Sequence, residues 1–250
     1  MIKIPLSEPP EGIDYHPLKE KGLSPHGVPQ LANRSKRSQE EIYNTAFHEA
    51  AHAVMCIIKR GELDEVIVNE EADADGRLGS CHYFEADKYM DRVWIALAGP
   101  AATSIQLGIG LREAYLSGGQ YDFDKAYSEL GRVLYPRVPA ELRDYIGLDA
   151  RKYLRVHADG WVPEGVHGQM KRKLTAFTKE CVKVDEYVCS WVRWEAEQVR
   201  HWLSETSGML DSVKYLADHL FKVRRMKGKE IIELMSPYYA ARQAAGKLAA

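Results

Sequence analysis

The sequence predicts a mainly α-helical fold that carries one small β hairpin. Apolar residues recur at helical spacing over most of the chain from position 38 onwards. Two short runs rich in β-forming residues, 63–68 and 78–84, interrupt this pattern and flank an acidic turn at 70–76. The 250 residues allow one large domain or two small ones, and we expect a single domain over residues 38–250.

The N-terminal segment 1–37 differs from the rest of the chain in composition. It contains six of the 11 prolines and shows little hydrophobic periodicity. Proline-rich segments of this kind lack the apolar residues that a packed core needs. We therefore expect residues 1–37 to form an extended arm.

The first predicted helix has recognisable ends. Ser38 and Glu41 have the spacing of a capping box, in which each side chain binds the other residue's backbone amide. Gly61 is a typical C-terminal stop. Between them, apolar residues recur at helical spacing at Ile42, Ala46, Phe47, Ala50, Val54 and Ile57.

The elements after this helix follow from the same patterns. The runs 63–68 and 78–84 predict the hairpin, with His82 as a surface or strand residue. A helix is expected over 87–107, with a kink at Pro100. Glycines within 108–119 interrupt the helical pattern before the next predicted helix at 121–134. Further helices are predicted at 139–156, 164–205, 208–224 and 227–248, the last broken near Pro237.

Composition limits the partners and the compartment. With 45% hydrophobic and 28% charged residues the chain is globular, and a net charge of −2 gives no reason to expect nucleic acid as a partner. No apolar run approaches the roughly 20 residues of a membrane helix, and the N-terminus lacks the apolar core of a signal peptide. The four cysteines form no C-x-x-C pair, which is typical of reduced thiols. We expect a cytoplasmic protein without membrane contact.

A metal-binding pattern lies in the middle of the first helix. His48 and His52 are four residues apart, so both imidazoles point from the same helix face and can reach one ion. Glu49 between them is offset around the helix, where it can accept a proton from a water activated by the metal. Two buried histidines would each be costly without a shared partner. The pattern His-Glu-x-x-His predicts a catalytic zinc site with Glu49 as the general base.

The third metal ligand must come from elsewhere in the chain. The extended pattern with a third histidine is absent, since positions 55 and 58 are Met and Ile. A later carboxylate is therefore required. Glu113, Asp122 and Asp124 are the candidates, and their spacing alone does not separate them.

The metal motif and several other segments together resemble the peptidase domain of FtsH-type, ATP-dependent zinc metalloproteases. Those enzymes carry a similar histidine helix, a segment Leu-(Gly/Ala)-Gly-x-Ala-Ala like residues 96–102, and closing helices like 216–231. Their third zinc ligand is an Asp followed by an apolar residue, and Phe123 and Ala126 place Asp122 on it. The resemblance implies a zincin-like helical metallopeptidase domain that binds Zn²⁺ through His48, His52 and Asp122 and hydrolyses polypeptides.

The chain also departs from that family. Ala51 and Tyr121 replace a glycine and an asparagine, and no phosphate-binding G-x-x-x-x-G-K-[ST] motif is present. A separate unfoldase is the partner that this absence suggests, and an oligomer is compatible with the sequence although the family's hexameric ring is not implied. Two alternatives stay open: a catalytically idle metal-binding interaction module, and a zinc hydrolase of a non-peptide substrate.

Overall fold

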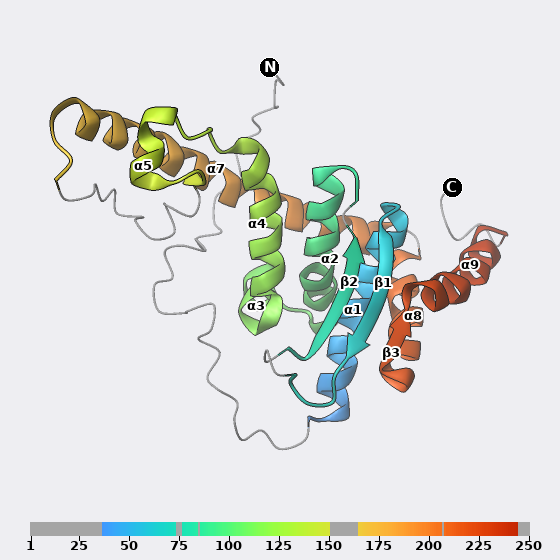
Figure 1. Cartoon of the computed structure of the whole chain (residues 1–250). Helices are drawn as coiled ribbons and strands as arrows, with labels where there is room; N and C mark the ends of the chain where they lie inside the picture. Colours follow the sequence, from blue (N-terminus) through green and yellow to red (C-terminus); the bar gives the residue numbers. More distant parts are fainter. Residues whose placement is uncertain (1–36, 74–76, 85, 151–164, 207, 245–250) are drawn as a thin grey trace. The chain divides into compact units, whose positions relative to one another are not determined.

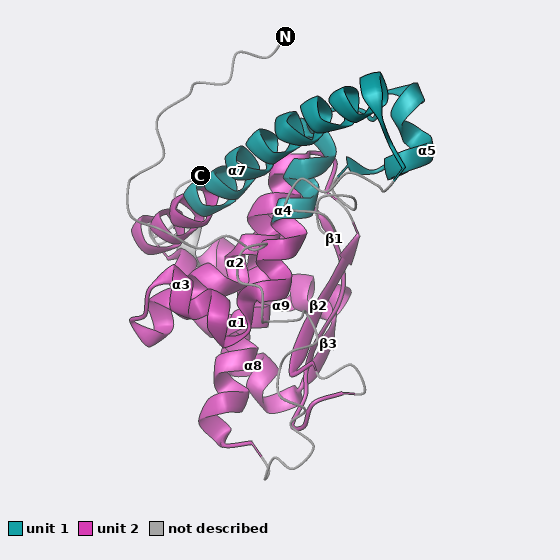
Figure 2. Cartoon of the chain, turned by 90° about the vertical axis from the view of Figure 1, so that its left-hand side faces the viewer, with its two compact units in different colours: residues 1–28, 127–194 teal, residues 29–126, 195–250 magenta. Residues whose placement is uncertain are grey.

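The computed structural model describes residues 37–73, 77–84, 86–150, 165–206 and 208–244. The predicted arm over 1–37 lies outside these residues except for Arg37. As predicted, the described chain is mostly helical, and it divides into two compact units (Figure 2). Of the described residues, those within 127–194 form unit 1, and those within 37–126 and 195–244 form unit 2. The single domain over 38–250 stays a prediction.

Helix α1 spans Gln39–Ile58 and begins with the predicted capping box. The Ser38 hydroxyl accepts a hydrogen bond from the Glu41 amide at 3.1 Å, and the Glu41 carboxylate accepts one from the Ser38 amide at 2.8 Å. The helix ends before Gly61, because Arg60 already adopts a left-handed conformation with φ of 57°. The first predicted helix is thus confirmed, with its last turn slightly shorter than expected.

A three-stranded antiparallel sheet follows α1 in unit 2 (Figure 1). Strands β1, Glu62–Val68, and β2, Gly79–Phe84, form the predicted hairpin. A third strand, β3 (Arg225–Lys227), which the sequence did not predict, pairs with the other side of β1. The strand order is β2-β1-β3, so β2 is an edge strand in the part of the chain that the structure describes.

Helix α1 packs against the sheet and against two further helices of unit 2, α2 (Tyr89–Leu107) and α8 (Met209–Val223) (Figure 1). Both α1 and α2 are rich in buried alanine, and such small side chains let packed helix backbones approach closely. The fully or almost fully buried alanines are Ala46, Ala50, Ala51 and Ala53 on α1, and Ala96, Ala98, Ala101 and Ala102 on α2.

The chain between α2 and the next long helix is a series of short turns. Helix α3 covers Leu111–Ala114, a kinked turn η1 covers Tyr115–Gly119, and helix α4 runs from Gln120 to Leu134. Gly118 takes a φ of 138°, which side-chain-bearing residues rarely adopt. Gly119 follows and lies close to Pro100 of α2, since a Cβ at position 119 would be 3.1 Å from the proline ring. These two glycines bring the start of α4 onto α2.

One of the helices predicted in unit 1 was wrong. In place of one helix over 139–156, the structure has a 3₁₀ turn η2, Ala140–Leu142, and a short helix α5, Arg143–Ile146. Gly147, with φ of 74°, ends α5, and residues 151–156 lie outside the described residues. Helix α7, which begins in unit 1, spans Gly168–Glu205. The core of the unit consists of Val138, Leu142, Ile146, Ala150, Leu174, Phe177 and Cys181.

The last helix, α9, spans Gly228–Ala244 without the break that was predicted near Pro237. Proline removes one helical hydrogen bond and leaves the carbonyl four residues before it without a partner. Pro237 and Glu233 are both exposed, so water can reach that carbonyl and the helix continues. The start of α9 approaches β1 closely, because a Cβ on Gly228 would lie 1.7 Å from the Leu63 carbonyl oxygen.

Candidate metal centre

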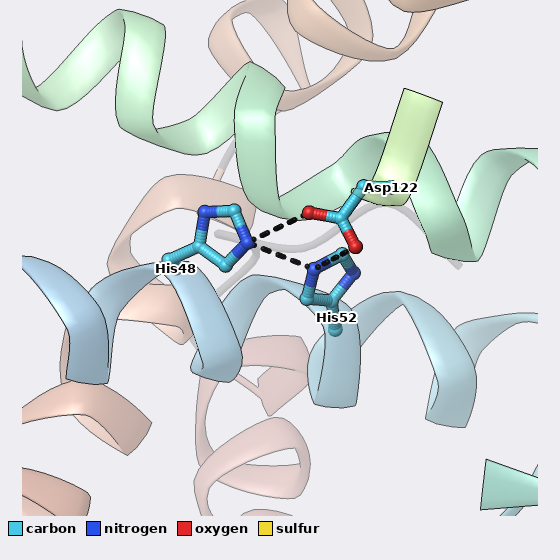
Figure 3. A group of neighbouring side chains, drawn as sticks. All are labelled: His48, His52 and Asp122. Carbon is cyan, nitrogen blue, oxygen red and sulfur yellow. Dashed lines mark hydrogen bonds and ion pairs between the residues drawn. The ribbon is translucent and has the colours of Figure 1, made fainter. Parts of the chain in front are cut away.

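Three side chains from two helices of unit 2 converge on one point (Figure 3). His48 and His52 come from consecutive turns of α1, and Asp122 comes from the first turn of α4. The Nε2 atoms of the two histidines are 3.1 Å apart. The Asp122 carboxylate lies with Oδ2 3.0 Å from Nε2 of His48 and Oδ1 3.5 Å from Nε2 of His52. Within the described residues, this group could hold a metal ion.

The spacing of these atoms suits a small tetrahedral ion. Zinc bonds of about 2.0–2.2 Å to nitrogen and oxygen place neighbouring tetrahedral ligands about 3.3 Å apart. The two Nε2 atoms are 3.1 Å apart, and each has a different Asp122 oxygen nearby, Oδ2 at 3.0 Å from His48 and Oδ1 at 3.5 Å from His52. The distance between the two imidazole nitrogens is thus close to the spacing that a tetrahedral ion requires.

The outer nitrogen of each imidazole binds a group on α2. Nδ1 of His52 donates a hydrogen bond to the carbonyl oxygen of Ile95 at 2.7 Å. This bond leaves Nε2 as the nitrogen whose lone pair can bind a metal. Nδ1 of His48 lies 3.0 Å from the Thr103 hydroxyl, which can accept or donate a hydrogen bond. Helix α2 thus orients both imidazoles.

Electrostatics couple His52 and Asp122 tightly. Burial by itself lowers the pKa of His52, but the neighbouring Asp122 carboxylate outweighs it and raises this pKa to about 9. Burial likewise acts to raise the pKa of Asp122, while His52 and the hydrogen bond with His48 hold it below its usual range. In the metal-free protein a proton on His52 takes the place of the cation that the carboxylate attracts.

Glu49 is buried beside the two histidines, with 7% of its surface exposed. Burial raises the pKa of Glu49, the charges of His48 and His52 lower it, and that of Asp122 raises it. Its side chain packs against the edge strand, because a Cβ built on Gly79 of β2 would lie 2.8 Å from its Oε1 atom. The carboxylate is thus held between α1 and β2, close to the three candidate ligands.

The other residues considered from the sequence lie elsewhere. Among the described residues, Glu113 and Asp124 do not belong to the group that could hold a metal ion. His82 is exposed and lies 3.0 Å from the Ser80 hydroxyl. Because side chains alternate along a strand, it faces away from Gly79 and Glu49. Tyr83 is on the same face of β2 as Gly79, with Nζ of Lys125 3.9 Å from its ring centre.

Sequence reasoning missed the contribution of α2. The Ile95 carbonyl, Gly99 and Thr103 all contact the two histidines, yet none of them is part of the histidine motif. In the sequence, the feature that could have identified these three residues is their spacing of four, which places them on one face of a helix.

No protein-family model matches the chain, and a search of curated proteins also finds no match. Among the described residues, no helix is by itself long and apolar enough to cross a membrane. The helix pair Tyr89–Leu107 and Leu111–Leu134, bent by 118°, meets the length and composition criteria only when taken together.

Proposed function

We propose that this chain is a zinc metallopeptidase related to the peptidase domain of FtsH-type proteases. The observation that carries the proposal is the convergence of His48, His52 and Asp122 at 3.0–3.5 Å, with the Glu49 side chain buried beside them. A purely structural metal site has no need of a base and is usually closed by four protein ligands. Three ligands and an adjacent carboxylate are the composition of a catalytic site.

Zinc is the metal that this donor set favours. Two neutral imidazoles and one carboxylate are common zinc ligands, and their distances suit a tetrahedral ion. Bound zinc would supply a water of lowered pKa and a positive charge that polarises the scissile carbonyl.

Glu49 is the proposed general base and acid. Its carboxylate is held against Gly79 and interacts electrostatically with His48, His52 and Asp122. It accepts a proton from the attacking water and then gives that proton to the leaving amine of the cleaved peptide. Asp122 and the two histidines orient the reaction centre but do not transfer this proton.

An extended polypeptide is the proposed substrate. Strand β2 is at the edge of the sheet, and its inward face contacts Glu49 through Gly79. The backbone groups at such an edge can pair with an extended peptide and hold it parallel to the strand. Folded proteins present few such segments, and a separate unfoldase is therefore the proposed partner.

The test is cleavage of casein, an unfolded protein, by purified wild type and by Glu49→Gln, with the zinc content of both measured. Glu40→Gln is the matched control, because Glu40 is on the same helix but exposed in its first turn. We expect equal zinc in all three proteins, with cleavage by wild type and Glu40→Gln and none by Glu49→Gln.

Other outcomes separate the alternatives. Zinc in all proteins but no cleavage of casein or of a peptide library by any of them would contradict the peptidase and favour the idle interaction module. Undiminished cleavage by Glu49→Gln would show that Glu49 is not the general base. A wild type that binds no zinc would refute the metal centre itself.

A further inference from the structure

Gly99 of α2 lies directly against the two metal-binding imidazoles. A Cβ atom built on this glycine would be 2.3 Å from Nε2 of His52 and 2.5 Å from Nε2 of His48. The third-nearest atom would be Cε1 of His48, at 2.7 Å. All three contacts are far shorter than carbon–nitrogen or carbon–carbon van der Waals distances, so no side chain fits at position 99 in this arrangement.

A Cβ at position 99 would overlap with the side of each imidazole that faces the proposed metal ion. Zinc–nitrogen bonds are about 2.0–2.1 Å long, and the Cβ would be only a few tenths of an ångström farther from both Nε2 atoms. A methyl group at position 99 would therefore compete with the ion for space beside the two nitrogen lone pairs.

The imidazoles cannot simply move aside and keep their orientation. His52 is fixed by its bond to the Ile95 carbonyl, and His48 by its contact with Thr103. Both of these partners are on α2, the helix that carries Gly99. Moving either ring away from position 99 breaks its outer hydrogen bond and turns its Nε2 away from Asp122.

We propose that Gly99 is a positioning residue of the metal centre, whose missing side chain reserves the space for the ion. The inference rests on the proposed metal site. It also accounts for a glycine in the interior of α2, where glycine is a poor helix former and alanine the best. Gly99→Ala should consequently leave the helix intact, displace the imidazole rings and remove the metal.

The experiment measures the affinity of the metal-free protein for Zn²⁺ and the absorption spectrum of its Co²⁺ form. Wild type, Gly99→Ala and Gly110→Ala are compared, and circular dichroism reports the folding of each metal-free protein. Gly110→Ala is the matched control, because a Cβ there would meet only the side chain of Glu113, which is exposed and can move away.

We expect Gly99→Ala to fold as wild type does, to bind Zn²⁺ about 100-fold more weakly or worse, and to lose the Co²⁺ spectrum of a tetrahedral site. Gly110→Ala should behave as wild type. Zn²⁺ binding by Gly99→Ala at wild-type affinity would overturn the inference. An unfolded metal-free Gly99→Ala would overturn it too, since position 99 would then serve helix packing. A wild type that binds no Zn²⁺ refutes the proposed function, and the inference with it.

Discussion

The backbone of Gly79 packs directly against the side chain of Glu49. A Cβ at position 79 would lie 2.8 Å from Oε1 and 2.9 Å from Cγ of Glu49, and 2.6 Å from Cγ2 of Thr45. The edge strand thus determines where the carboxylate lies, although it supplies none of the metal ligands.

Substitution of this glycine should separate metal binding from turnover. We expect Gly79→Ala to push the Glu49 carboxylate out of position and to lower kcat for a peptide substrate about 100-fold, the effect typical of a 1 Å misplacement. The zinc content should be unchanged, because the three atoms nearest to a Cβ at position 79 belong to Glu49 and Thr45. Steady-state kinetics measure kcat, and metal analysis of the same samples measures the zinc content. An unchanged kcat would show that Glu49 does not depend on β2.

Asp122 and Asp124 provide a matched pair for the third ligand. Both are on α4, but only Asp122 belongs to the group that could hold a metal ion. Asp122→Asn should remove most of the zinc, since a neutral amide is a much poorer ligand than a carboxylate. Asp124→Asn should retain one zinc per chain. Metal analysis after dialysis checks this prediction, and equal zinc loss in the two variants would contradict the assignment.

Thr103 should tune the metal affinity without being a ligand. Its hydroxyl is 3.0 Å from Nδ1 of His48 and orients that ring. Thr103→Val keeps the shape but removes the hydroxyl, and we expect zinc affinity to fall about 10-fold to 100-fold. Thr103→Ser retains the hydroxyl and should remain close to wild type. Competition with a chromophoric chelator measures the three affinities, and a wild-type value for Thr103→Val would exclude this role.

Zinc binding should also depend on pH in a definite direction. In the metal-free protein, burial lowers the pKa of His52 but Asp122 raises it to about 9, so the imidazole carries a proton at neutral pH. Metal binding must displace this proton. We expect about one proton released per zinc at neutral pH, and an affinity that rises about tenfold per pH unit until it levels off near pH 9.

Calorimetry in buffers of different ionisation enthalpy gives the number of protons released. The same His52–Asp122 pair should stabilise the metal-free fold below the ordinary histidine pKa of about 6.5. That contribution is lost as the pH rises through about 9. An affinity independent of pH between about 6 and 8.5 would contradict the tight coupling of the two side chains.

Local patterns in the sequence were sufficient to predict α1 and the hairpin. Ser38 and Glu41 are neighbours on the same helix turn, and His48 and His52 share a helix face whatever surrounds them. These features depend on residues a few positions apart, so no knowledge of the rest of the fold was needed.

The third ligand and β3 depend on contacts that the local sequence does not encode. Spacing could not separate Asp122 from Asp124, because the position of α4 is set by the turn at Gly118 and by the approach of Gly119 to Pro100. Strand β3 has three residues and forms by pairing with β1, about 160 positions earlier in the chain. The break expected at Pro237 did not occur because its surroundings are exposed.

The contacts of α2 with the histidines depend on the exact number of residues between positions 95 and 103. The Ile95 carbonyl, Gly99 and Thr103 are separated by four residues each and meet His52, the space for the ion, and His48 in turn. Inserting one residue between positions 95 and 99 would rotate the helix beyond it by about 100° and turn Gly99 and Thr103 off the histidines together. A one-residue insertion between positions 95 and 99 should therefore abolish zinc binding, and the zinc content of such a variant would show it.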